Sequence, residues 1–220
     1  MNEPRMASAA DLAAATQHLG LQLDTSTVER LLAYLGLLQR WNATYNLTAV
    51  RDPSQMLAQH LLDCLAVVGP LRRHLGTRRA RILDVGSGGG LPGAVIAIVC
   101  PDWEVCCVDA VGKKVAFIRQ TAMELKLANL VGAHARVEKL AAGIFDVITS
   151  RAFASLADFT ALTRRHLANG GVWMAMKGRQ PQDELLALPP DVDVFHVEQL
   201  DVPGLDAQRC LIWMRPRADQ

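Results

Sequence analysis

The 220-residue sequence has no cysteine pair with metal-binding spacing and no long apolar run. Its five cysteines are an odd number without a C-x-x-C pair, so they indicate neither a disulfide framework nor a zinc site. We interpret them as small buried hydrophobic residues of a reducing cytosol. The longest apolar stretch, near Ala94–Cys100, is too short to cross a bilayer, and Met1–Gly20 has no apolar core typical of a signal peptide. We therefore expect a soluble cytoplasmic protein, without a bound metal and monomeric.

The sequence also lacks an excess of either charge, with 23 Lys and Arg against 22 Asp and Glu. Half of its residues are apolar, which excludes a disordered chain, and its length suits one α/β domain with a short extension. A net charge of +1 alone argues against nucleic-acid binding. That value hides an asymmetry, because residues 1–180 carry +6 and residues 181–220 carry −5. A partner of negative charge is therefore compatible with the first 180 residues.

Apolar residues at helical spacing dominate roughly the first 70 residues. Ser26-Thr27-Val28-Glu29 is typical of a capping box that opens a helix. Asp52-Pro53 is typical of a second helix start, with proline at the first helical position. We predict a helical extension over residues 1–75 that packs on a main domain of residues 76–220.

Short apolar strands alternate with helices after residue 80. Strands are predicted at Arg81–Val85, Glu104–Asp109, Gly132–Val137, Phe145–Ser150 and Val172–Lys177. Helices are predicted between them at Leu91–Cys100, Lys113–Leu127 and Leu156–Leu167. This alternation is typical of a doubly wound, mostly parallel sheet. Two further strands, Asp193–Leu200 and Arg209–Met214, would form an antiparallel pair at its edge.

A glycine-rich loop between the first strand and its helix is the strongest functional signal. It runs from Asp84 to Gly93, where glycines let the backbone approach a ligand and the helix start offers unpaired N–H groups. Asp109 ends the next strand, where an acid commonly accepts hydrogen bonds from ribose hydroxyls. The loop and this acid together predict a cofactor that contains a nucleoside.

The spacing of the glycines narrows the choice of cofactor. Gly86 and Gly88 match the first two glycines of the dinucleotide fingerprint, but Leu91 stands at the third, and no Lys-Ser/Thr pair of a Walker motif follows. The pattern Gly86-x-Gly88-x-Gly90, with Asp84 before it, resembles the first motif of class I S-adenosylmethionine (SAM)-dependent methyltransferases. We therefore predict that Rossmann-like fold, with the N-terminal helical extension added to it.

Several blocks together resemble the RsmG (GidB) family, bacterial methyltransferases that act on N7 of a guanine in 16S ribosomal RNA. They are Leu38–Thr48 (LQRWNATYNLT), His60–Cys64 (HLLDC, with Cys64 where the family usually has Ser), Asp84–Gly93 (DVGSGGGLPG), Ser150–Ala154 (SRAFA) and Lys177-Gly178. The resemblance covers about residues 31–215. It implies SAM as cofactor and 16S rRNA or the small ribosomal subunit as partner.

The resemblance also implies which residues contact the cofactor. Gly86 and Leu91 would line the loop and the methionine end, and Val137 and Glu138 would lie beside the adenine. Arg151 would be a further contact. The fold itself adds Asp109 at the ribose, with Gly88 and Asp84 as parts of the loop.

The chemistry of guanine N7 needs no general base, because N7 already carries a lone pair. We therefore expect catalysis by positioning and water exclusion, without a catalytic His or carboxylate pair. Arg151 and Lys177 lie at predicted carboxyl ends of strands and would hold a guanine oxygen or a phosphate, although Lys177 is equally compatible with a structural role. His60 and Asp63, three residues apart, are interpreted as a structural pair. Trp41 would pack the extension onto the main domain, and Asn42 and Asn46 would bond local backbone.

Two sets of basic residues are candidates for RNA contact. The first precedes the first strand and would lie away from the cofactor; it consists of Arg72, Arg73, Arg78, Arg79 and Arg81. The second is spread over the main domain and consists of Lys113, Lys114, Arg151, Arg164, Arg165, Lys177 and Arg179.

Three other functions stay open on the sequence. An NAD(P)-dependent oxidoreductase is disfavoured by Leu91, and a small-molecule methyltransferase by the blocks at Trp41–Thr48 and Arg151. A non-catalytic RNA-binding or ribosome-assembly protein that keeps the SAM fold is the third.

Overall fold

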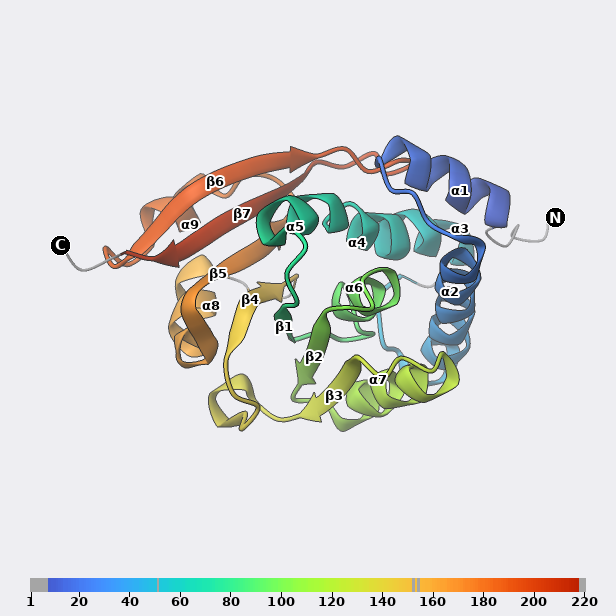
Figure 1. Cartoon of the computed structure of the whole chain (residues 1–220), viewed down its shortest axis with the longest axis horizontal. Coiled ribbons are helices and arrows are strands. Elements are labelled where there is room, and N and C mark those ends of the chain that lie inside the picture. Colours follow the sequence, from blue (N-terminus) through green and yellow to red (C-terminus); the bar gives the residue numbers. More distant parts are fainter. Residues whose placement is uncertain (1–7, 51, 152, 154, 218–220) are drawn as a thin grey trace.

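A seven-stranded sheet forms the centre of the computed structural model, which describes residues 8–50, 52–151, 153 and 155–217 (Figure 1). Its strand order is β3-β2-β1-β4-β5-β7-β6. The first five strands are parallel, and β7 pairs antiparallel with both β5 and β6. The strands are β1 (Arg81–Val85), β2 (Glu104–Asp109), β3 (Leu130–His134), β4 (Phe145–Ser150), β5 (Leu167–Lys177), β6 (Val192–Leu200) and β7 (Arg209–Pro216). The predicted doubly wound sheet with an antiparallel edge pair is confirmed.

Helices cover both faces of the sheet (Figure 1). One face carries α2 (Thr25–Tyr45), α4 (Asp63–Leu65), α5 (Val68–Leu75), α6 (Gly93–Val99) and α7 (Gly112–Glu124). The other carries α8 (Leu156–Thr163) and α9 (Gln182–Leu186). Outside this sandwich, α1 (Ala9–His18) packs against α2. Helix α3 (Pro53–Met56) comes after α2 in the chain.

The predicted strands at β1, β2 and β4 have the observed bounds, whereas other boundaries differ. Strand β3 ends at His134, and Val137 begins a short 3-10 turn, Val137–Lys139, so the residue predicted at a strand end lies beyond it. The predicted capping box at Ser26 is wrong. Asp24 is the N-cap of α2, and its carboxylate accepts from the Thr27 amide at 2.7 Å. Helix α9 was not predicted, and α1 lies within the predicted helical extension, although its own bounds were not predicted.

The helical segment after Asp52 is continuous but irregular. A π-helical turn at Leu57–Leu62 separates α3 from α4. Its His60, Leu61 and Leu62 are buried, and π-helical turns often occur at functional sites. Arg51, which precedes the segment, lies outside the described residues.

The helices of the first 75 residues share their core with the sheet. Leu31, Leu38 and Leu65 belong to one buried cluster with Val95 and Phe117 of the main domain. Trp41 packs edge-on against Phe117, with ring centroids 5.6 Å apart, as predicted. All five cysteines are buried and unpaired, also as predicted. The N-terminal helices are therefore positioned rigidly enough to take part in a site.

Candidate active site

The glycine loop follows β1 at the carboxyl edge of the sheet. Gly86 has a φ of +67°, a left-handed conformation that side chains rarely adopt. At Gly93, where α6 begins, a Cβ atom would lie 2.8 Å from Oδ2 of Asp84. The sequence therefore needs glycine at both positions to bring the loop and the helix start against the sheet.

Asp84 lies beneath the loop, fully buried. Its Oδ2 accepts from the Gly93 amide at 2.8 Å, whereas its Oδ1 has no partner among the described residues. Burial raises the pKa of this carboxyl to about 7. Asp84 thus fixes the start of α6 from below and does not line either of the two cavities described next.

Asp109 ties the loop to the end of β2. Its Oδ2 accepts from the Gly88 amide at 2.9 Å, and its Oδ1 accepts from the Val111 amide at 2.8 Å. Each carboxylate oxygen has a second lone pair. Asp109 can therefore accept further hydrogen bonds from a ligand while it holds Gly88 in place.

A cavity of about 270 Å³ opens beside Gly86 and Asp109; we call it the apolar cavity. It is lined by Val85, Gly86, Val108, Asp109, Ala110, Ala135, Arg136, Val137, Glu138, Phe153 and Leu162. Four residues predicted to contact a cofactor therefore meet here: Gly86, Asp109, Val137 and Glu138. Gly88 and Leu91 lie in the adjoining loop and do not line the cavity, and Leu91 is buried.

The long N-terminal helix α2 braces the loop from the other side. Tyr34 is fully buried, and its hydroxyl donates to the Gly89 carbonyl at 2.6 Å. A Cβ atom at Gly89 would lie 2.8 Å from Cδ1 of Leu38. The contact of Tyr34 with the loop was not predicted. Tyr34 nevertheless lies on the apolar face of a helix that the sequence did predict.

A second cavity, the charged pocket, lies at the carboxyl ends of β4 and β5. Its volume is about 410 Å³, and it is lined by Gln59, His60, Asp63, Arg151, Met176, Lys177, Gly178 and Arg209. The structure therefore places Arg151 and Lys177 together here, and not among the residues lining the apolar cavity. Ser150 Oγ, next to Arg151, donates to the Val85 carbonyl at 2.7 Å, so Arg151 is nevertheless close to the glycine loop.

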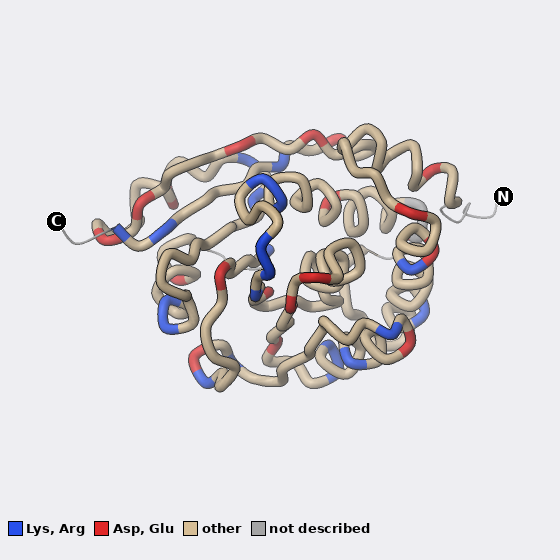
Figure 2. Tube along the Cα trace, in the orientation of Figure 1, with Lys and Arg blue, Asp and Glu red and all other residues tan. Residues whose placement is uncertain are grey.

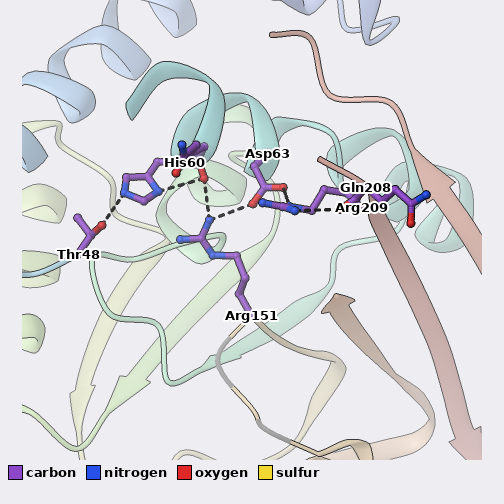
Figure 3. A network of polar contacts seen from close by, with 7 residues as sticks. Thr48, His60, Asp63, Arg151, Gln208 and Arg209 are labelled. Carbon is purple, nitrogen blue, oxygen red and sulfur yellow. Dashed lines mark hydrogen bonds and ion pairs between the residues drawn. The ribbon is translucent and has the colours of Figure 1, made fainter. Parts of the chain in front are cut away.

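A buried carboxylate links two arginines in the charged pocket (Figure 3). Asp63 has a side chain 1% exposed, and its Oδ2 accepts from Arg151 Nη1 at 3.0 Å. Its Oδ1 accepts from Arg209 Nε at 2.9 Å. Arg151 Nη1 also donates to the Gln59 carbonyl at 3.1 Å. Arg209 was not predicted, and no local sequence signal marks it.

His60 belongs to the same network through its neighbours (Figure 3). Its Nδ1 donates to the Gln59 carbonyl at 3.0 Å, and its Nε2 accepts from the Thr48 hydroxyl at 2.7 Å. Burial, together with the charge of Arg151, lowers the pKa of His60 to about 4, so the ring is neutral. The predicted pair of His60 with Asp63 is wrong, because Asp63 bonds the two arginines. The prediction that Asn42 bonds local backbone is confirmed. Its side-chain oxygen accepts from the Thr48 N–H, and its side-chain nitrogen donates to the Val50 carbonyl.

Lys177 is held by an ion pair at the rim of the charged pocket. Its Nζ lies 2.7 Å from Oε2 of Glu184 and donates to the Phe153 carbonyl at 3.1 Å. Glu184 comes from α9, which was not predicted. Ala152 and Ala154, in the block around Arg151, lie outside the described residues.

The basic residues before β1 gather along α5 and the connection to β1 (Figure 2). Arg72 donates to the Val99 carbonyl, Arg73 pairs with Glu198 at 2.6 Å, and Arg81 donates to the Ile144 carbonyl. Since they precede β1, they lie toward the amino ends of the parallel strands, opposite the glycine loop, as expected. Arg78 and Arg79 are exposed.

Two other features, a membrane-spanning helix and a metal-binding cluster, are absent from the residues that the structure describes. No described helix is long and apolar enough to cross a membrane. Within the same residues, no three His, Cys, Asp or Glu side chains are grouped closely enough to hold a metal ion.

Solved structures of other proteins show the class of fold. The chain matches TrmN from Thermus thermophilus with a TM-score of 0.56 and 19% identity, over 73% of this chain and 53% of that one. It matches a SAM-dependent methyltransferase from Aquifex aeolicus with a TM-score of 0.54 and 15% identity, over 74% and 93% of the two chains. The seven-stranded sheet and its glycine loop are thus the fold of class I SAM-dependent methyltransferases.

Sequence comparison identifies the family. The model of the GidB family, described as rRNA small subunit methyltransferase G, matches residues 27–212. A protein named "Ribosomal RNA small subunit methyltransferase G" from Leptothrix cholodnii is 63% identical over 94% of this chain and 95% of its own length. One of the same name from Acidovorax sp. is 62% identical over 91% and 92%. The chain belongs to this methyltransferase family, and the predicted resemblance is confirmed.

Proposed function

We propose that the chain transfers a methyl group from SAM to N7 of a guanine in 16S ribosomal RNA. The observation that carries this proposal is the juxtaposition of the two cavities at the carboxyl edge of the sheet. One is largely apolar and contains the Asp109 carboxylate, which suits ribose, and the other is cationic. Such a substrate would place the protein in the cytoplasm, where we propose that it acts as a monomer.

The residues of the apolar cavity fit SAM. Val137 and Phe153 supply apolar surface for a purine, and the Asp109 carboxylate has lone pairs for ribose hydroxyls. Gly86 has no side chain, so the backbone there can approach the methionine end of SAM. SAM contains no pyrophosphate, so it does not require the third glycine of the dinucleotide fingerprint, whose position Leu91 occupies. We assign Gly88, Leu91 and Asp84 to support of the loop and Glu138 to the adenine edge.

Bound SAM would supply a methyl group on a cationic sulfur. The chain's own residues then need only bring N7 in line with that group and keep water out, because the N7 lone pair is already available. Arg151 lies between the loop and the charged pocket, where its guanidinium can hold a substrate oxygen near the transfer point. Lys177, neutralised by Glu184, would act by closing the rim of the charged pocket.

Transfer of labelled methyl from SAM to small-subunit RNA, followed by mapping of the modified nucleotide, tests the proposal. We expect one N7-methylguanine in 16S rRNA. Binding of SAM and RNA without transfer would indicate a non-catalytic assembly protein. Transfer to small molecules and not to RNA would indicate a small-molecule methyltransferase.

A further inference from the structure

We propose that Arg209 and Arg151, held together by Asp63, form a binding site for a backbone phosphate of the substrate RNA. The site rests on the proposed function, and it assigns a ligand, an RNA phosphate, to the charged pocket. Arg209 is the new member of the site, and Asp63 is its positioning residue.

Strand pairing brings Arg209 to the pocket from the far end of the chain. Arg209 opens β7, which runs antiparallel to β5, with Cys210 opposite Lys177. Arg209 therefore lies next to the carboxyl end of β5, where Lys177 and Gly178 line the pocket. Its side chain is 24% exposed, so a ligand in the pocket can reach it.

Asp63 makes it possible for two guanidinium groups to lie in one small space. It offers one oxygen to each arginine, at 3.0 and 2.9 Å, and thereby offsets their mutual repulsion. Each arginine donates a hydrogen bond to Asp63 through one of its nitrogens. Within the described part of the chain, Nε and Nη2 of Arg151 and Nη2 of Arg209 have no hydrogen-bond acceptor. Two partly free guanidinium groups on a fixed carboxylate are suited to the oxygens of a phosphate.

The charge and lining of the pocket favour a phosphate over a base. Three cations, Arg151, Arg209 and Lys177, face two carboxylates, Asp63 and Glu184, which leaves one positive charge in excess. The neutral His60 adds none. Among the described residues, the lining contains no Phe, Tyr or Trp on which a base could stack. The stacking surface of Phe153 belongs instead to the apolar cavity.

The test compares Arg209→Gln with Arg215→Gln as matched control. Arg215 is on the same strand and also bonds an aspartate, Asp193, through Nε at 2.9 Å, but it does not line the pocket. Binding of a 16S rRNA fragment is measured by fluorescence anisotropy over a range of salt concentrations. Calorimetry with S-adenosylhomocysteine and circular dichroism check the cofactor site and the fold.

We expect Arg209→Gln to weaken RNA binding about five-fold at about 100 mM salt and to reduce the slope of log K against log salt by about 0.7. Arg215→Gln should keep both values, and both variants should bind S-adenosylhomocysteine normally. An unchanged salt slope in Arg209→Gln, or an equal loss in Arg215→Gln, would overturn the phosphate site while wild-type methylation stands. A wild type that binds no RNA would overturn the proposed function, and this site with it.

Discussion

The apolar cavity and the charged pocket share one edge of the sheet but arise differently from the sequence. The apolar cavity is built from the last residues of β1 and β2, from the segments that follow β1 to β4, and from Leu162 of α8. The charged pocket combines a π-helical turn of the N-terminal segment, the ends of β4 and β5, and the first residue of β7. The first therefore arises within the parallel part of the sheet, and the second also needs the helical segment and the antiparallel strand β7.

The two regions therefore depend on different parts of the chain. The apolar cavity needs the loop geometry and Asp109, which ties Gly88 to the end of β2. The charged pocket needs Asp63 and His60 from the helical segment that covers the sheet. We therefore expect changes in the apolar cavity to affect the cofactor, and changes in the charged pocket to affect RNA.

The strongest effect concerns the pH dependence of stability, in which His60 of the charged pocket and Asp84 beneath the glycine loop act in opposite directions. The unfolded chain protonates His60 below pH 6.5, whereas the folded protein resists protonation until about pH 4. His60 therefore contributes stability that is complete above pH 6.5 and is lost as pH falls toward 4, about 3 kcal/mol in all. Asp84, whose pKa is raised from 3.8 to about 7, has the opposite effect: its contribution is lost as pH rises toward 7. The free energy of unfolding in urea is measured between pH 4 and 8. His60→Gln should remove the loss of stability toward pH 4, and Asp84→Asn should remove the loss toward pH 7. Parallel pH curves for wild type and His60→Gln would contradict this.

The next effect concerns catalysis in the charged pocket. Arg151→Ala should reduce methyl transfer about 100-fold, because a positioned charged hydrogen-bond donor near the transfer point is lost. Binding of S-adenosylhomocysteine should change little. Arg215→Ala, which removes an exposed arginine paired with Asp193, serves as control. Full activity of Arg151→Ala in a transfer assay would refute the assignment.

In the apolar cavity, Asp109→Asn should weaken S-adenosylhomocysteine binding about ten-fold. The amide offers one acceptor oxygen where the carboxylate offers two, so it cannot hold both the Gly88 and Val111 amides. Calorimetry measures the affinity. RNA binding by anisotropy should stay at the wild-type value, and a parallel loss of both would show that the two regions are not separable.

The smallest effect lies between the two regions. Tyr34→Phe removes the hydrogen bond to the Gly89 carbonyl at almost constant volume, which leaves a buried acceptor unpaired and costs about 1 kcal/mol. We expect about five-fold weaker binding of S-adenosylhomocysteine and faster amide exchange in the glycine loop. Tyr45→Phe, at an exposed ring, is the control. Equal exchange in both variants would show that Tyr34 does not brace the loop.

The sequence predicted the parts of the molecule that depend on local patterns. Strands β1, β2 and β4 are apolar runs with clear ends, and the glycine loop has its own spacing. Asp84 was part of that spacing, but its buried place under Gly93 depends on how closely α6 approaches the sheet. Helix α1 has a local signal that was overlooked, a capping box of Ser8 and Asp11.

Arg209 shows why the rest could not be predicted. Its place in the charged pocket depends on the antiparallel register of β7 on β5, which no pattern around residue 209 encodes. The pairing of His60 likewise depends on the π-helical turn, which separates its ring from Asp63 and directs it to Thr48. Long-range packing decides both contacts.

A crystal structure of the protein with S-adenosylhomocysteine tests the division between the two regions most directly. We expect the adenine between Val137, Glu138 and Phe153, the ribose hydroxyls at the Asp109 carboxylate, and Asp63 still bonded to Arg151 and Arg209. A ligand bound in the charged pocket, with its ribose away from Asp109, would contradict it.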